Sequence, residues 1–299
     1  MHDSPAPRPA PSRHRHRYRQ HRRTGRANRT GAGRNRPLAL LIAATLLLWA
    51  FTSGHPGAAV GAAAPPPRPP TAGKRLVFAE DFTKPAWGRR WRTDRSGAYR
   101  YGTHNPADDK LDWLDSRAIT LDKGTATLTA TPNGPRLRDG RRTWRTALMT
   151  TEGSREGFRV RVGDYIETRV VLPADRGAWP GLWTWRDGGN EVDVFEYHAD
   201  APGILEFANQ VRPSGTRHSA PAAVAPGRPL TVGLLLGSRS NTWYVGGRRV
   251  YEDRSGVGAG WSAYLVLNLS VSAGRHHPAP RGTRPLRMSV AHVHVWRPH

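Results

Sequence analysis

The chain has 299 residues, no cysteine and a formal net charge of +23. The lack of cysteine excludes a disulfide framework. The charge is uneven, because 12 of the 46 basic residues but only one of the 23 acidic residues precede residue 73. The rest of the chain keeps 34 basic and 22 acidic residues, a net charge of +12, which suits an anionic polymer but does not choose a substrate.

The first 73 residues do not have the composition of a globular fold. Residues 1–37 are rich in Arg, His, Pro and Gly, and their only acid is Asp3, so we predict a disordered basic tail. Residues 38–51 are an uncharged apolar run of 14. Residues 52–73 are a Pro/Ala-rich linker. A basic segment followed by a short apolar run is typical of an export signal.

Two interpretations of residues 38–51 stay open. Fourteen apolar residues are short for a membrane span, which needs about 20, so the segment fits a cleaved signal. The weakly apolar sequence after it can also extend it into a retained anchor, with the preceding arginines holding the N-terminus in the cytoplasm. In both cases residues 74–299 are expected to be extracellular, secreted or tethered to the outer face of the cell membrane. We interpret the arginines as a topology signal and expect no nucleic-acid partner.

Residues 74–299 predict one all-β domain. Short runs of alternating or β-branched residues are separated by turn clusters, and no long helical period is visible. The expected strands, in chain order, lie in residues 74–82, 116–122, 124–132, 157–173, 203–211, 230–237, 241–252, 263–272 and 286–296. Hairpin turns are expected at residues 122–124 and at Gly246-Gly247. The pattern predicts an antiparallel β-sandwich.

The segment NEVDVFEYH, residues 190–198, places Glu191, Asp193 and Glu196 in an otherwise apolar run. In a regular strand Glu191 and Asp193 share one face, and Glu196 falls on the other. One extra residue at Val194-Phe195, a β-bulge, would return Glu196 to the face of the other two acids. The apolar residues between the acids predict a packed reverse face.

Two glutamates leaning together suit glycoside hydrolysis. At a separation of about 5–5.5 Å one carboxylate can attack the anomeric carbon while the other donates a proton. Crowding and burial raise the pKa of a carboxyl group, which favours a protonated member. A calcium-binding acidic cluster and a solvated strand edge are the structural alternatives. The spacing alone does not say which glutamate plays which part.

The segment EVDVFE resembles the ExDxxE signature of glycoside hydrolase family 16. Further segments resemble the family in chain order: LVFAEDF, YIETRVVLP, GAWPGLW, TWYVGGRRVYE, YLVLNLSV and MSVAHVHVW. The resemblance spans residues 76–296 and implies a jelly-roll, concanavalin A-like sandwich and an endo-β-glucanase or laminarinase-like activity. It implies that Glu191 is the nucleophile, Glu196 the general acid/base, and Asp193 the residue that tunes the pair.

The resulting hypothesis is an exported retaining endo-β-glycan hydrolase that acts on β-1,3- or β-1,3-1,4-glucan. A sulfated-galactan hydrolase and a transglycosylase are alternatives on the same scaffold. A non-catalytic carbohydrate-binding sandwich is the alternative from another class, although a pure binder has no need of three desolvated carboxylates.

Six further residues are candidates for substrate binding. Aromatic rings offer flat apolar contact to sugar faces. Trp183 and Trp185 share a strand face if the strand is regular, whereas Tyr197, His198 and Asn209 follow the acids along the chain. The full set is Trp179, Trp183, Trp185, Tyr197, His198 and Asn209. Trp113 and Trp144 are weaker candidates for more distant subsites.

No metal or cofactor is predicted. His292 and His294 share a strand face, but no third ligand is evident, so we expect an ordinary surface strand. Members of the resembled family carry a structural calcium held by an Asp in the last strand, and the matching position here is Ala291. A polysaccharide is the expected partner, the membrane is expected to be contacted only through the N-terminal apolar segment, and the protein is expected to be a monomer.

Overall fold

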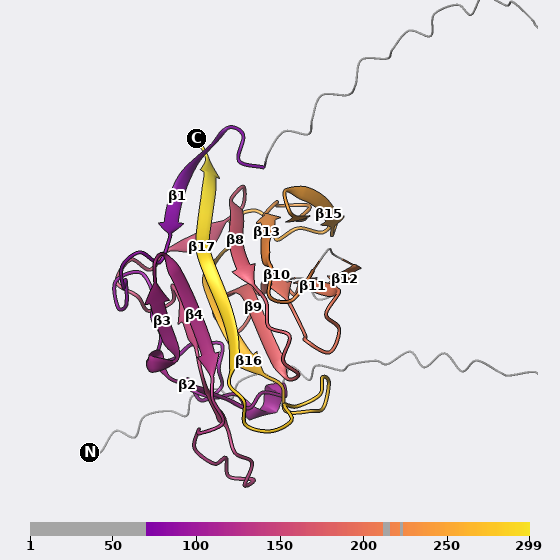
Figure 1. The fold of residues 1–299 in the computed structure, drawn as a ribbon. Helices are drawn as coiled ribbons and strands as arrows, with labels where there is room; N and C mark the ends of the chain where they lie inside the picture. Colours follow the sequence, from indigo (N-terminus) through magenta and orange to yellow (C-terminus); the bar gives the residue numbers. More distant parts are fainter. Residues whose placement is uncertain (1–69, 212–215, 222–223) are drawn as a thin grey trace, which may run out of the picture. The chain divides into compact units, whose positions relative to one another are not determined.

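The computed structural model describes residues 70–211, 216–221 and 224–299 (Figure 1). The predictions for residues 1–37, 38–51 and most of 52–73 lie outside the described residues. Across the described part of the chain, none of the helices has the length and apolar character that a membrane span requires.

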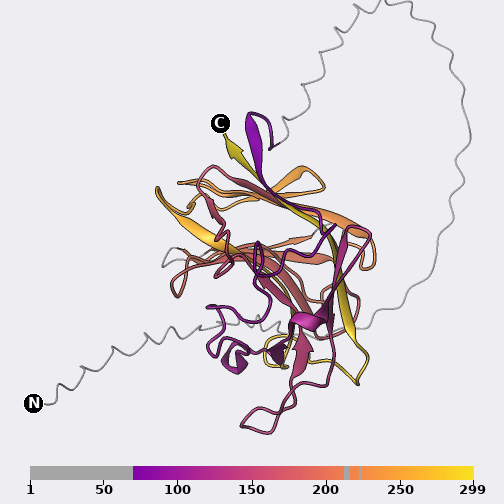
Figure 2. The same ribbon diagram turned by 90° about the vertical axis from the view of Figure 1, so that its left-hand side faces the viewer.

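Two β-sheets form the two layers of the fold (Figures 1 and 2). The larger sheet has the strand order β15 (Arg248–Glu252), β14 (Thr242–Val245), β13 (Pro229–Leu235), β8 (Tyr165–Val171), β17 (Leu286–Pro298), β4 (Thr125–Ala130) and β3 (Ile119–Asp122), with β1 (Lys74–Glu80) also paired to β17. The other sheet has the order β12 (Thr216–Pro221), β11 (Ile204–Asn209), β10 (Val192–Glu196), β9 (Ala178–Trp185), β16 (Ser262–Val271) and β6 (Leu148–Thr150), with β7 (Arg159–Arg161) also paired to β16.

Every strand pair in these two sheets is antiparallel among the described residues, which confirms the predicted antiparallel sandwich. A separate short pair, β2 (Asp112–Leu114) and β5 (Trp144–Thr146), is parallel. Two single-turn 3-10 helices, η1 (Pro106–Asp108) and η2 (Ser116–Ala118), flank β2. The sequence did not predict β2 or β5, because three-residue strands are too short to show a period.

Side-chain alternation determines which face of each strand is buried. In β8, Ile166, Thr168 and Val170 are buried, whereas Glu167 and Arg169 lie on the outer face. The inner faces of both sheets pack into one hydrophobic core, in which β10 contacts β13, β16 contacts β4, and β9 contacts β17. This is the period-two pattern expected of a sheet with one buried face.

Both predicted hairpin turns are present. Lys123 and Gly124, between β3 and β4, have φ values of +45° and +75°. Gly246 and Gly247, between β14 and β15, have φ values of +57° and +76°. Two consecutive residues with positive φ are the requirement of a type I′ turn, whose twist matches that of the flanking strands.

Candidate active site

Strand β10 carries the predicted β-bulge. Against β9, Asp193 pairs with Trp183, and the next two register positions, Leu182 and Gly181, pair with Phe195 and Glu196. One residue, Val194, is therefore extra. Against β11 the register also shifts between Asp193 and Glu196. Because β10 gains one residue relative to both neighbours, Glu196 returns to the face that carries Asp193.

The apolar residues of the bulge explain why it is stable. Val194 and Phe195 are consecutive, yet both are fully buried in the core. The backbone carbonyl of Asp193 accepts a hydrogen bond of 2.8 Å from the Trp243 Nε1–H. A buried carbonyl without a partner is costly, so this indole satisfies a group at the point where the ladder is irregular.

Three tryptophans line the face of β9 that lies beside the acids. Trp179, Trp183 and Trp185 are all partly exposed, whereas the intervening Leu182 is fully buried in the core. Gly181 stands between the first two tryptophans and opposite Glu196. A Cβ at this glycine would lie 3.3 Å from the Phe195 carbonyl oxygen and 3.6 Å from Trp183 Cδ1. The prediction that Trp183 and Trp185 share a face is confirmed.

Glu196 contacts the first of these rings directly. Trp179 Nε1 donates a hydrogen bond of 2.9 Å to Glu196 Oε1, and Glu196 is half-buried. At the other end of the acidic segment, Glu191 precedes β10, and its backbone carbonyl accepts a 2.9 Å hydrogen bond from Gln210 N–H. Val192 is buried in the core, so Glu191 and Asp193 alternate with it on the opposite face. The fold thus brings all three acids to the face that also carries Trp179 and Trp183.

A buried hydrogen-bond chain holds Trp183. Its Nε1 donates to Asn268 Oδ1 at 2.8 Å, and Asn268 Nδ2 donates to Ser270 Oγ at 2.6 Å. Ser270 Oγ then donates to Asp112 Oδ2 at 2.8 Å, and the Tyr99 hydroxyl donates to the same oxygen at 2.5 Å. Burial raises the pKa of Asp112. A fully connected polar chain of this kind fixes one orientation of the ring at its end.

Lys110, which was not predicted from the sequence, lies over Trp179 and Trp183. Its Nζ is 4.6 Å from the Trp179 ring centroid and 5.7 Å from that of Trp183, distances at which a cation is attracted to an aromatic face. Burial lowers the pKa of Lys110, but the nearby Asp108, Tyr99 and Asp112 raise it well above the ordinary value. Asp108 Oδ2 is 2.7 Å from the ammonium. A positively charged group therefore lies over Trp179, the ring that donates a hydrogen bond to Glu196.

Glu206 is a fourth acid on this face and was not predicted from the sequence. In β11, Leu205 and Phe207 are buried in the core, which turns Glu206 to the opposite face. The register pairs Glu206 with Glu196. Directly opposite residues on neighbouring strands have Cβ atoms about 4.5–5.5 Å apart. Its position follows only from the pairing of β10 with β11, which the sequence does not reveal.

Two of the predicted substrate-binding residues lie elsewhere. Tyr197 is fully buried in the hydrophobic core, because the residue after Glu196 faces inward. Asn209 is also buried, and its Nδ2 donates to Asp253 Oδ2 at 2.7 Å and to the Gly256 carbonyl at 2.8 Å. It pairs with the inward-facing Val192. Alternation along β10 and β11 therefore turns both side chains away from the face that carries the acids.

His198 and the two weaker tryptophan candidates have different surroundings. His198 is buried beside Trp179, with ring centroids 4.9 Å apart. Trp144, predicted as a distant subsite, is buried in the core. Trp113 is partly exposed and stacks on His104 at 4.5 Å, and His104 in turn stacks on the exposed Tyr101 at 4.7 Å.

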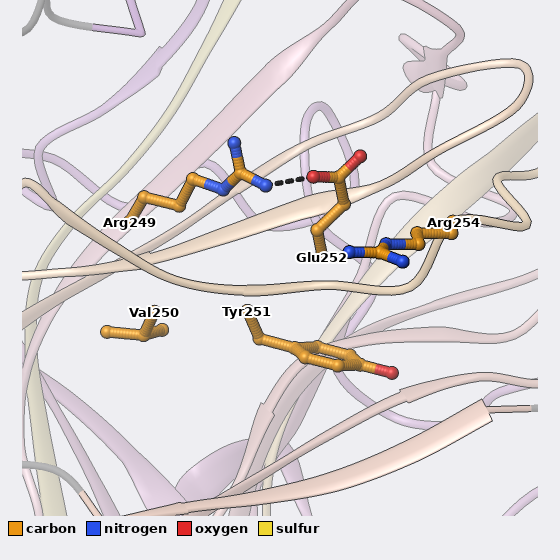
Figure 3. A pocket seen from close by; sticks show the side chains of 5 residues that line it. All are labelled: Arg249, Val250, Tyr251, Glu252 and Arg254. Carbon is orange, nitrogen blue, oxygen red and sulfur yellow. Dashed lines mark hydrogen bonds and ion pairs between the residues drawn. The ribbon is translucent and has the colours of Figure 1, made fainter.

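Two other groups of polar side chains in the described residues are weaker candidates for a catalytic site. A surface hollow at β15 is lined by Arg249, Val250, Tyr251, Glu252 and Arg254 (Figure 3). Its one carboxylate, Glu252, is bonded to Arg249 and to Ser240 Oγ. On the outer face of β17, the rings of His292 and His294 stack with centroids 4.3 Å apart. His292 Nε2 lies 3.5 Å from Glu167 Oε1, and His294 Nε2 lies 2.7 Å from Asp81 Oδ1. The two histidines share a face, as predicted.

Several solved structures share this architecture. The endo-β-1,3-glucanase of Pyrococcus furiosus superposes with a TM-score of 0.63 at 18% identity, over 75% of this chain and 94% of that one. The catalytic domain of an endo-1,3-β-glucanase (laminarinase) of Thermotoga petrophila superposes with a TM-score of 0.62 at 20% identity, over 75% and 98%. SCLam, a non-specific endo-β-1,3(4)-glucanase from family GH16, gives 0.62 at 19% identity, over 76% and 92%.

The fold is that of the family 16 glucanases. This confirms the fold that the sequence resemblance predicted. In sequence, the chain is 22% identical over 221 residues to the endo-1,3-1,4-β-glycanase EglC of Rhizobium meliloti, which covers 65% of this chain. The chain spans about half of that relative, 46% of its length. No family model matches the chain.

Proposed function

We propose that the protein is a retaining endo-β-glycan hydrolase that acts on β-1,3- or mixed β-1,3-1,4-glucan. The observation that carries the proposal is the bulge at Val194-Phe195, because it returns Glu196 to the face that carries Asp193, the face to which alternation also assigns Glu191. The proteins that share the fold are endo-glucanases by name, and the sequence relative is an endo-1,3-1,4-β-glycanase. These names support the choice of β-glucan.

In the proposed reaction, a Glu191 carboxylate oxygen attacks the anomeric carbon, and the bond from that carbon to the leaving oxygen breaks. Glu196 gives its proton to the leaving oxygen, so the departing sugar is neutral. Glu196 then removes a proton from water, and the water oxygen displaces Glu191 from the anomeric carbon. Two displacements retain the anomeric configuration. Asp193, between the glutamates in sequence, is proposed to tune their protonation.

The surrounding residues fit a sugar-binding cleft. The partly exposed rings of Trp179 and Trp183 flank Gly181, the residue opposite Glu196. A flat ring held in one orientation offers apolar contact to a sugar face at little entropic cost. We propose that these rings, with Trp185, bind the sugars on both sides of the cleaved bond. The stacked Tyr101, His104 and Trp113 are proposed to extend the cleft.

The protein is proposed to act outside the cell, secreted or held at the membrane by residues 38–51. A polymeric glucan is too large to enter a cell, so an endo-acting enzyme is of use only where its substrate is.

The decisive experiment is a reducing-sugar assay of the purified chain on laminarin, lichenan, agarose and carrageenan, with the product anomers followed by NMR. We expect release from laminarin or lichenan with the β anomer formed first. Release from carrageenan alone would instead assign a sulfated-galactan substrate. An α anomer formed first would contradict double displacement.

Paired variants test the assigned roles. Glu191→Gln should abolish turnover, whereas Glu206→Gln, which alters a carboxylate on the same face, should retain most of it. Glu196→Ala should still form the glycosyl-enzyme from an activated aryl glycoside, and azide should accelerate its release. A Glu191→Gln variant with full activity would show that the nucleophile is another residue. Binding of glucan by all variants without turnover by the wild type would assign a carbohydrate-binding sandwich.

A further inference from the structure

A cluster of two histidines and one aspartate lies beside Trp179 and has no part in the proposed hydrolysis. His198 and Asp200 belong to the turn after β10, and His277 belongs to the loop after β16. Their metal-ligating atoms all lie within 4.8 Å of one another. His277 Nδ1 is 3.2 Å from both carboxylate oxygens of Asp200. The rings of His198 and His277 are stacked, with centroids 3.3 Å apart and planes inclined by 7°.

We propose that His198, Asp200 and His277 bind a divalent transition-metal ion, with Zn²⁺ as the best fit. Two imidazole nitrogens and one carboxylate oxygen are a ligand set that Zn²⁺ favours, with a fourth position left for water. Calcium and magnesium prefer sites made of oxygen ligands. The donor chemistry therefore selects a borderline-soft ion over the hard cations.

The spacing of the three groups is close to what such an ion needs. Tetrahedral Zn²⁺ with bonds of about 2.0–2.1 Å places its ligand atoms about 3.3–3.4 Å apart. The donor atoms here lie within 4.8 Å, so each pair needs to approach by at most about 1.5 Å. Parallel stacked rings do not aim their lone pairs at one point, so one ring must turn on binding. His277 is the ring better placed to turn, because its side chain is 25% exposed whereas His198 is buried.

The two loops that carry the ligands are held in place by other contacts. The buried Asp109 carboxylate accepts hydrogen bonds from the backbone amides of Arg275, at 3.0 Å, and His276, at 2.8 Å. The Ser272 hydroxyl donates to the His277 carbonyl at 2.5 Å. Gly177, with φ of +88°, lets this loop approach β9, because a Cβ there would lie 2.4 Å from Pro280 Cδ. Because the backbone of this loop is already fixed, metal binding loses less conformational entropy in ordering it.

On the other side, the Ala201 amide donates to the His198 carbonyl at 2.9 Å, which closes the turn that presents Asp200. His198 itself is only 4% exposed. The site therefore combines one buried ligand with two accessible ones, so an ion can enter from solvent.

The test is calorimetric titration of the full chain with ZnCl₂ in a buffer that does not bind metal. Five histidines precede residue 70 and are His2, His14, His16, His21 and His55. They contribute equally in every variant, so the site is measured as a difference. The wild type is expected to bind one more equivalent tightly than His277→Gln or Asp200→Asn. Loss of a direct ligand should weaken that site by at least the roughly 10–100-fold that loss of a second-shell partner costs.

Two further readouts make the outcome definite. Bound Co²⁺ should give a visible absorption spectrum in the wild type that both variants lack. Zn²⁺ should raise the Tm of the wild type more than that of the variants, since a ligand bound to the folded state stabilises it. Asp200 is exposed, so Asp200→Asn remains informative if His277→Gln folds poorly.

The matched control is His294→Gln on β17, which alters the other stacked histidine pair, also paired with a carboxylate. This variant should titrate like the wild type. Equal stoichiometry in the wild type, His277→Gln and Asp200→Asn would overturn the proposal, as would loss of the site in His294→Gln. Because these measurements do not involve glucan, they test the metal site independently of the proposed hydrolysis.

Discussion

Deletion of Val194 tests whether the bulge in β10 is a one-residue insertion whose removal leaves a regular strand register. Without Val194, the pairs Asp193–Trp183, Phe195–Leu182 and Glu196–Gly181 would follow one another in a regular register. The same deletion regularises the pairing with β11, because Glu196 already faces Glu206. Glu196 would keep its strand partners and its face. We therefore expect a folded protein.

The cost of this deletion can be worked out from the structure. The fully buried Val194 side chain contributes about 1.5–3 kcal/mol by burial. The hydrogen bond from Trp243 to the Asp193 carbonyl is worth about 1 kcal/mol and can be lost when the carbonyl rejoins the ladder. The regular ladder returns a similar amount. The expected loss is about 1.5–3 kcal/mol, or a fall in Tm of roughly 3–12 °C at about 2–4 °C per kcal/mol for a domain of this size.

The assay is urea unfolding followed by tryptophan fluorescence, with deletion of Val232 as the matched control. Val232 is also a fully buried valine, but it lies in β13, whose pairing with β8 and β14 is regular. Its deletion turns the rest of the strand to the wrong face and should cost more than about 4–5 kcal/mol. If the two deletions are equally damaging, Val194 is not a removable insertion, and the account of why Glu196 faces the cleft is wrong.

Three further predictions concern residues around the site. Asp253 accepts five hydrogen bonds, from Asn209 Nδ2, from Asn241 N and Nδ2, and from the amides of Ser255 and Gly256, so Asp253→Ala should cost about 3 kcal/mol in urea unfolding at pH 7. Burial opposes ionisation, but these donors hold the pKa of Asp253 below its ordinary value. The stabilisation that Asp253 provides is therefore full above the unfolded pKa of about 3.9 and is lost as pH falls through the folded pKa. A difference in unfolding free energy between Asp253→Ala and the wild type that does not narrow at low pH would contradict this. Tyr197→Phe should change the free energy of unfolding by less than about 1 kcal/mol and leave activity intact, since the buried hydroxyl has no hydrogen-bond partner among the described residues. A large loss of turnover would instead show that the Tyr197 hydroxyl takes part in the reaction or in substrate binding. Asn268→Leu removes the acceptor of the Trp183 Nε1 hydrogen bond. If Trp183 binds sugar, KM for glucan should rise about tenfold with little change in kcat, since a loss of about 1.4 kcal/mol of binding free energy is tenfold in affinity. An unchanged KM would show that Trp183 does not bind the substrate.

The sequence predicted the sandwich and the bulge because both depend on local pattern. Period-two alternation and paired positive-φ residues at Lys123-Gly124 and Gly246-Gly247 determine strands and hairpins within a few residues. The bulge was predictable for the same reason, since two apolar residues between Asp193 and Glu196 indicate an inward-facing pair. Alternation continued by one residue also predicts an inward-facing Tyr197, whereas its position next to the acid in sequence suggests substrate binding. Nearness in sequence was a poor guide to nearness in space there.

Asn209 shows where a local pattern stops being informative. Its amide lies at the end of a strand whose outward face carries Glu206 and Ala208, so the face could be inferred only once Phe207 was known to be buried. Glu206, Lys110 and His277 are harder still, because each reaches the cleft region through a pairing between segments far apart in the chain: β10 with β11, Lys110 with Ser272, and the loop after β16 with Asp109. Period-two alternation gives a side chain its face but not its neighbour across the sheet. Residues that other segments bring near the acidic strand are therefore identified only from the three-dimensional register, whereas the acidic strand itself is identified from the sequence alone.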